Sequence, residues 1–266
     1  MRTLIKKAPI ISSVVISIFF MVIAKLIGRA WVFGDGAVSL FLYEFVQMLL
    51  PFLLVLLCSD ADVYKKGSML KTFAAGGYLL VGQLLLLFIM FTETFFSEGT
   101  IWQTPVGIMF GIVSLFGIGF REESIFRGIV VNNIAKKYLG NRKGVYVTVL
   151  TSGFLFGAMH LSNLVLGVNP FSVVIQSVVA MASGFYLAAI YLRGGSLWAL
   201  IIMHTLVDSA SMFKASFTTN NGTMADAIGE LSLSNLTPFF VLSLLTLFLL
   251  RKEKCDEIIE RYKTAE

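Results

Sequence analysis

Long apolar stretches are the feature that most limits how this chain can fold. About eight of them follow one another along the 266 residues, each close to the roughly 20 residues that cross a bilayer as a helix. They cover about residues 8–28, 36–58, 72–95, 105–135, 144–162, 171–192, 196–213 and 233–250. Soluble domains carry about 25% charged residues, whereas this chain carries 14% at a mean hydropathy of +0.84. The sequence therefore predicts an all-α, polytopic membrane bundle of about eight transmembrane helices.

The basic residues predict which ends of the helices face the cytoplasm, because cytoplasmic loops collect Lys and Arg. Most of the 21 basic residues fall before the first segment, in the second, fourth and sixth loops, and in the tail that begins at Arg251. The opposite loops hold only Arg29 and Lys214. This alternation predicts an even number of spans with both termini cytoplasmic. We expect a multi-pass protein of the plasma membrane.

The chain has no stretch that could form a separate soluble domain, so residues 1–266 are expected to form a single membrane domain. Residues 251–266 read as a charged cytoplasmic tail that can form a short, solvated surface helix. Cys58 and Cys255 are too far apart to suggest a disulfide framework or a CxxC metal site. The basic residues are scattered over loops, so nucleic acid is not an expected partner.

The fourth apolar segment contains a dense group of charges, Arg121, Glu122, Glu123 and Arg127. Ionisable groups at bilayer depth are costly and usually mark a functional site. Glu123 and Arg127 are four residues apart with the acid first, the favourable order for an ion pair on one helix face. Glu122 is turned about 100° away and is free for chemistry. The alternative is that these charges only neutralise one another at a membrane edge.

The fourth segment is also long for a single span. About 31 helical residues would extend about 46 Å, against a hydrocarbon core of about 30 Å. The helix must therefore tilt, break near Gly117 and Gly119, or begin outside the membrane. Two GxxxG pairs, Gly107/Gly111 and Gly153/Gly157, suggest close helix packing, with a chance pattern of glycines as the alternative.

The chain has two histidines, His160 and His204, and both lie in apolar segments. A single buried histidine is more often a satisfied core residue than a catalyst. Here, however, His204 and Asp208 are four residues apart on one face, and Phe156 lies one turn before His160 as a packing wall. Counted from the nearest inner loops, Glu122, His160, His204 and Asp208 all lie about 16–25 Å deep. The pattern predicts one intramembrane site.

Three motifs in chain order carry a family resemblance: Glu122-Glu123-x-x-x-Arg127, Phe156-x-x-x-His160 and His204-x-x-x-Asp208. They resemble the motifs of the CAAX-protease and bacteriocin-processing (Abi) family of intramembrane endopeptidases, which includes the type II CAAX prenyl proteases. The resemblance covers about residues 105–213, the expected catalytic core. Several members are expected to have Asn in place of Asp208. Because an ionised Asp only accepts hydrogen bonds, Asp208 would either be protonated or orient His204.

The resemblance implies peptide-bond hydrolysis. Glu122 and His160 would hold and deprotonate a water, and His204, supported by Asp208, would donate to the developing oxyanion. Glu123 and Arg127 would fix the helix. This version needs no cofactor. A zinc version, with Glu122, His160 and His204 as ligands around an open fourth position, stays open, although the chain lacks an HExxH motif.

The expected partners are the lipid bilayer and a peptide or protein substrate in or at the membrane. The resemblance allows peptide precursors, bacteriocins or pheromones, and CAAX-like C-termini. Two other functions stay open: a non-catalytic scaffold or bacteriocin immunity factor, and a proton-coupled transporter. The lack of internal repeat symmetry disfavours the transporter.

Overall fold

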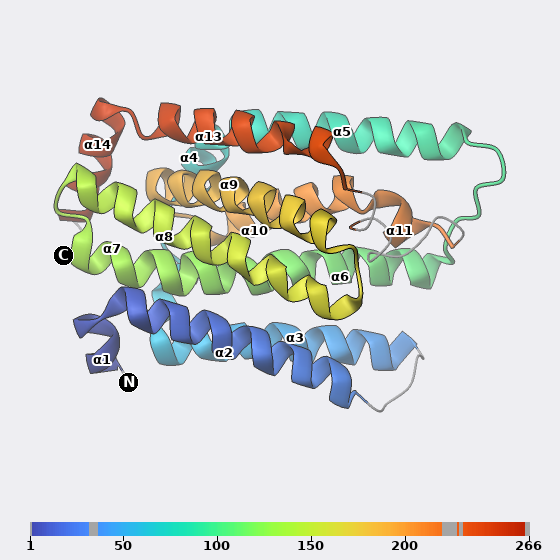
Figure 1. Ribbon diagram of the computed structural model, residues 1–266, viewed down its shortest axis with the longest axis horizontal. Coiled ribbons are helices and arrows are strands. Elements are labelled where there is room, and N and C mark those ends of the chain that lie inside the picture. The colour runs from blue at the N-terminus through green and yellow to red at the C-terminus, as the bar shows by residue number, and fades with distance from the viewer. Residues whose placement is uncertain (1, 32–36, 220–227, 229–230, 264–266) are drawn as a thin grey trace.

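The computed structural model describes residues 2–31, 37–219, 228 and 231–263, which form a bundle of helices joined by short connections (Figure 1). The longer helices are α2 (Pro9–Ala30), α3 (Ala37–Cys58), α5 (Gly77–Phe96), α6 (Pro105–Glu123), α8 (Arg142–His160) and α9 (Pro170–Gly194). The shorter elements are α1 (Arg2–Lys7), η1 (Ala61–Tyr64), α4 (Met69–Ala75), η2 (Ser124–Val131), α7 (Asn132–Tyr138), η3 (Leu161–Leu166), α10 (Leu197–Ser211), α11 (Phe213–Phe217), η4 (Leu233–Leu236), α13 (Thr237–Leu249) and α14 (Lys252–Lys263).

The predicted fold class, a polytopic helical membrane protein, is confirmed. Within the described residues, six helices are long and apolar enough to cross a membrane, and a seventh results if the bent pair η4–α13 and α14 is taken as one span. The seventh predicted segment forms α10, which has only 15 residues. The number of eight spans therefore stays a prediction.

Both ends of the chain lie at the same end of the bundle, where α1 and α14 are found (Figure 1). This is what an even number of crossings requires. The charged tail differs from the solvated helix we expected. α14 bends by 64° from the preceding helix and buries Cys255, Ile258 and Ile259, because its apolar residues repeat at helical spacing. Residues 264–266 lie outside the described part of the chain.

The fourth predicted segment is one unbroken helical run, Pro105–Tyr138. It passes through Gly117 and Gly119 as regular α6, so the break considered at these glycines does not occur. The run instead widens into a π-helix at η2, immediately after Glu123. Widened turns of this kind are rare and frequently lie at functional sites.

Polar side chains from outside and inside the run support η2. The Ser59 hydroxyl donates to the Gly128 carbonyl at 2.7 Å, and the Asn132 amide donates to Ser59 Oγ at 2.7 Å. The Asn133 amide donates to the Cys58 carbonyl at 2.9 Å. These bonds fasten the widened turn to the end of α3.

Only the second GxxxG pair packs one long helix against another. A Cβ atom on Gly153 would lie 2.0 Å from the Phe185 ring of α9, and one on Gly157 would lie 2.6 Å from the carbonyl oxygen of Ser177, also on α9. In the first pair, Gly107 faces the side chain of Gln103 just before its own helix, and Gly111 faces the short α11. Close helix packing is therefore confirmed at Gly153 and Gly157, and the structure identifies α9 as the partner.

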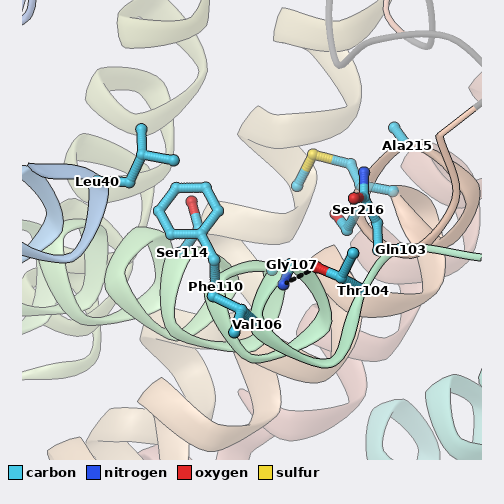
Figure 2. A pocket seen from close by; sticks show the side chains of 11 residues that line it. Leu40, Gln103, Thr104, Val106, Gly107, Phe110, Ser114, Ala215 and Ser216 are labelled. Carbon is cyan, nitrogen blue, oxygen red and sulfur yellow. Dashed lines mark hydrogen bonds between the residues drawn. The ribbon is translucent and has the colours of Figure 1, made fainter. Parts of the chain in front are cut away.

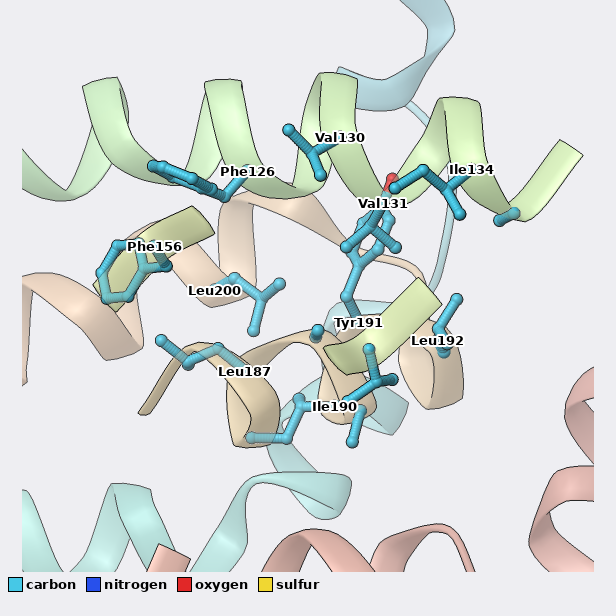
Figure 3. Close-up of a cluster of buried hydrophobic side chains, with 14 of the residues drawn as sticks. Phe126, Val130, Val131, Ile134, Phe156, Leu187, Ile190, Tyr191, Leu192 and Leu200 are labelled. Carbon is cyan, nitrogen blue, oxygen red and sulfur yellow. The ribbon is translucent and has the colours of Figure 1, made fainter. Parts of the chain in front are cut away.

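Packing is uneven along the bundle. At the end away from α1 and α14, a cavity of about 460 Å³ lies among α3, α6 and α11 (Figure 2). The middle is tightly filled: the cluster in Figure 3 brings together side chains from η2, α7, α9 and α10. Val131, Ile134, Ile190 and Leu200 are fully buried there. The charged stretch of α6 lies between these two regions.

The α8–α9 contact can be tested with Gly157→Val. The added side chain would collide with the backbone of α9, and overpacking of this kind costs about 1–3 kcal/mol. We expect a lower midpoint temperature for loss of the monodisperse peak in detergent size-exclusion chromatography. Gly82→Val on α5 is the matched control, because a Cβ atom at Gly82 has no neighbour within 4 Å. Equal midpoints for both variants would contradict the close contact.

Candidate active site

Gly119 lets α10 approach α6 closely. A Cβ atom on Gly119 would lie 2.9 Å from Thr205 Oγ1 and 3.1 Å from the carbonyl oxygen of Ile201, both on α10. His204 stands next to Thr205, so this contact brings its imidazole to the acids that end α6. Close approach of two helices at a glycine is the general means by which small residues bring backbones together.

His204 is the point where the predicted site residues meet. Its Nδ1 lies 2.7 Å from Glu123 Oε1, a hydrogen bond. Its Nε2 lies 3.6 Å from Glu122 Oε2 and 3.8 Å from Asp208 Oδ1, distances at which charges interact without a direct hydrogen bond. The structure therefore brings Glu122, Glu123, His204 and Asp208 together. The imidazole is held by Glu123, whereas the contact to Asp208 expected from the sequence is looser.

Glu123 forms the ion pair expected from its spacing to Arg127. Arg127 Nη1 lies 2.9 Å from Glu123 Oε1, and both side chains are fully buried. Arg127 also donates to the Gly184 carbonyl of α9 at 3.1 Å, and its guanidinium lies 5.0 Å from the centre of the Phe156 ring. Because the same Glu123 oxygen bonds His204, this acid joins α6 to α10, while Arg127 joins η2 to α9. Sequence reasoning found the ion pair and missed the bond to the histidine.

Phe156 separates the two imidazoles. Its ring centre lies 5.0 Å from that of His160 and 5.7 Å from that of His204, with both pairs edge-on. His160 Nδ1 lies 2.9 Å from the Phe156 carbonyl oxygen. A carbonyl only accepts, so Nδ1 carries the proton and Nε2 is the free acceptor. Just after His160, Lys25 of α2 donates to the Ser162 carbonyl at 2.9 Å.

Exposure divides the site residues into two groups. The side chains of Glu123 and Arg127 are 0% exposed, whereas those of Glu122 and Asp208 are 17% and 15% exposed. His160 is also partly exposed. Within the described part of the chain, Asp208 Oδ2 has no hydrogen-bond partner. The groups that a substrate or water can reach are therefore Glu122, His160 and Asp208.

The side chains do not form a ready metal site. Among the described residues, no group of three or more His, Cys, Asp or Glu side chains is arranged to hold a metal ion. The zinc set considered from the sequence was Glu122, His160 and His204. Of these, Glu122 and His204 approach each other, while His204 Nδ1 is already bonded to Glu123. A three-ligand zinc site would need these side chains to rearrange.

A second ion pair lies beside this site, between the partly exposed Arg121 of α6 and the buried Glu44 of α3. Arg121 Nη1 lies 2.6 Å from Glu44 Oε2, and the Ser114 hydroxyl donates to Glu44 Oε1 at 2.8 Å. Gly117 makes room, since a Cβ atom there would lie 2.8 Å from Glu44 Oε2. Sequence reasoning gave Arg121 no partner. The available signal was Glu44 itself, an acid within an apolar segment.

Fold and site together define a polytopic membrane protein with an acid–histidine cluster inside its helix bundle. A family model described as "Type II CAAX prenyl endopeptidase Rce1-like" matches residues 102–210, which contain all three motifs. Over that segment the chain is similar to the Rce1-like family, in line with the resemblance of its three motifs. The similarity suggests a CAAX-type intramembrane endopeptidase. Comparisons with curated proteins and with solved structures give no match.

The two adjacent acids should differ in what they do for stability. Glu123→Gln leaves the buried Arg127 without a counter-ion, and removing one partner of a buried pair costs about 3–5 kcal/mol. Glu122→Gln changes a partly exposed group and should alter the free energy of unfolding by about 0.5 kcal/mol or less. Denaturant titration in detergent measures both. Equal losses would mean that Glu123 is not the counter-ion of Arg127.

The Glu44–Arg121 pair can be tested in the same way. Glu44→Leu leaves Arg121 unpaired and should cost about 3 kcal/mol, whereas Glu44→Leu with Arg121→Met removes both charges and should recover most of that loss. Thermal unfolding in detergent compares the two. Glu93→Leu, which removes an exposed acid of α5, is the control. A double variant less stable than Glu44→Leu alone would contradict the idea that the two charges only neutralise each other.

Proposed function

We propose that this protein is an intramembrane endopeptidase that hydrolyses a peptide bond with a water activated by Glu122 and His160. The observation that carries this proposal is the division of labour between the two acids. Glu123 is fully buried and occupied by Arg127 and His204, so it can serve neither water nor substrate. Glu122 is partly exposed beside His204, and it is the acid left for chemistry.

In the proposed reaction, Glu122 takes a proton from the water, and the water oxygen attacks the carbonyl carbon of the scissile bond. The free Nε2 of His160 accepts a hydrogen bond that helps hold this water. The proton on Glu122 then passes to the leaving nitrogen as the carbon–nitrogen bond breaks. The products are a carboxylic acid and an amine, which become a carboxylate and an ammonium group by exchange of one proton, so atoms and charges balance without a cofactor.

His204 is the proposed donor to the oxyanion. Its Nδ1 donates to Glu123, so Nε2 points toward the side where Glu122 and Asp208 lie. Donation from Nε2 requires the doubly protonated ring, and the three carboxylates around it compensate that positive charge. Donors fixed before the reaction stabilise the transition state without reorganising. Asp208 completes this side of the ring, and the Glu123–Arg127 pair fixes its orientation.

The proposed catalytic core is about residues 105–213, within a single membrane domain. The substrate class is a small or membrane-associated peptide or protein: a peptide precursor, a bacteriocin or pheromone, or a CAAX-like C-terminus. The match to the prenyl endopeptidase family supports the last of these in particular. The positive-inside pattern supports a place in the plasma membrane with both termini cytoplasmic.

Substitution tests these roles. Glu122→Gln and His160→Ala should each reduce cleavage by about 10²-fold or more, because general acid–base catalysis contributes about 10²–10⁴-fold. Both variants should still insert and elute as the wild type does. Comparative peptidomics of membranes that contain wild-type protein or Glu122→Gln should show products only with the wild type.

Glu93→Gln, at an exposed acid of α5, is the control and should cleave normally. The wild-type protein should also stay active after washing with a chelator, with no stoichiometric metal by elemental analysis. Substantial activity in either Glu122→Gln or His160→Ala would remove that residue from its assigned role. Activity that is lost with the metal and restored by zinc would favour the zinc version.

A further inference from the structure

The cavity of about 460 Å³ at the end of the bundle away from the termini has a mixed but uncharged wall (Figure 2). Apolar side chains such as Leu40 and Phe110 alternate with polar ones such as Gln103 and Ser216. Among the described residues, none that carries a charge lines it. Its volume is within the range of pockets that bind small ligands, about 300–1,000 Å³.

Two helices of the active site run directly into this cavity. Ser114 lines the cavity and precedes Glu122 on α6 by eight residues, a rise of about 12 Å. Met212, also in the wall, follows Asp208 by one turn, and its backbone N–H donates to the Asp208 carbonyl at 2.8 Å. A chain that reached the site along α6 and α10 from this end would therefore pass through the cavity.

The two charges behind Ser114 neutralise each other. The Ser114 hydroxyl that faces the cavity is bonded to Glu44, and Glu44 is paired with Arg121. Ser114 therefore presents a neutral hydroxyl in front of a satisfied ion pair. A charged ligand would find no opposite charge in the wall, and burying it there would be costly.

The rim of the cavity consists of extended backbone. The Gln103 N–H donates to the Phe217 carbonyl at 2.9 Å, and the Thr219 N–H donates to the Ile101 carbonyl at 2.8 Å. This short antiparallel pairing is centred on Trp102 and Thr218. Extended backbone is the usual partner of extended peptides, which align with it through their main chain.

A second hollow differs from this cavity in the chemistry of its wall. It lies between α5 and the α10–α11 region and is lined almost entirely by aromatic and aliphatic side chains such as Leu84, Phe88 and Phe213. Such a wall suits a hydrocarbon ligand. The amide of Gln103 and the hydroxyls of Thr104 and Ser216 distinguish the first cavity, because they match the hydrogen-bonding groups of a peptide main chain.

We infer that this cavity is a substrate subsite that holds an uncharged, extended segment of peptide about three to four residues from the scissile bond. The distance follows from about 12 Å of α6 and about 3.3 Å per extended residue. The inference rests on the proposed peptidase function. The positive-inside pattern predicts that this end of the bundle faces away from the cytoplasm.

The test is cleavage of a randomised decapeptide library in detergent, with products identified by mass spectrometry. The wild type should exclude Asp, Glu, Lys and Arg at one position three or four residues from the cut. Ala215→Trp narrows the cavity and should reduce cleavage of peptides with large residues at that position by about 10-fold or more, the effect of a misfit in a pocket. Peptides with Gly or Ala there should be cleaved as before.

Ala215→Glu places a negative charge in the wall, so this variant should cleave peptides that have Lys or Arg at the same position. Met109→Trp, at an exposed residue of α6 that does not line the cavity, is the control and should keep the wild-type profile. Ala215→Val replaces Ala215→Trp if the larger variant does not elute as a folded protein.

The possible outcomes distinguish failure of the subsite from failure of the peptidase function. A wild-type enzyme that cleaves the library, with folded Ala215 variants that keep its profile or lose all peptides equally, overturns the subsite and leaves the peptidase intact. A wild type that accepts charged residues at every position also overturns the subsite. Failure of the wild type to cleave any peptide, while folded, overturns the peptidase function and the subsite with it.

Discussion

The structure depends on how one buried cation is neutralised. Arg127 is fully enclosed, and its charge is met by Glu123, by the Gly184 carbonyl and by the face of Phe156. An uncompensated charge at this depth would cost several kcal/mol. Glu123 cannot leave Arg127 to take part in proton transfer, so the site needs a second acid. Glu123 serves the fold, and Glu122, its neighbour about 100° around the same helix, is the carboxylate we propose for chemistry.

Interactions between residues about one turn apart could be predicted from the sequence. The spacing of Glu123 and Arg127 predicted their ion pair, and the Gly153/Gly157 pattern predicted a closely packed face on α8 without naming its partner. Both depend on helical geometry alone. The bond from Glu123 to His204 and the pair between Glu44 and Arg121 join different helices. Their formation depends on which helices become neighbours, which periodicity within one helix does not determine.

The bounds and surroundings of the helices also depend on contacts that periodicity within one helix does not predict. Apolar composition located every long segment, but the widened turn of η2 depends on Ser59, which is brought in from the end of α3. α10 begins at Leu197 because Gly195, with a left-handed φ of 83°, ends α9, and Ser196 then caps the next helix. The tail helix α14 is charged overall, yet Arg261 donates to the Leu192 and Arg193 carbonyls at the end of α9. Counting charges alone predicted a solvated helix there.

The Glu44–Arg121 pair also has a consequence for the order of synthesis. The chain is made from its N-terminus, so α3 reaches the membrane before α6 does. When α6 arrives with two arginines, Glu123 accompanies Arg127 on the same helix, and Glu44 is already present for Arg121. Neither cation has to wait for α8, α9 or α10 to be translated. The charged run from α6 into η2 can thus enter the lipid with both arginines already paired, and the histidines of the cluster are added afterwards.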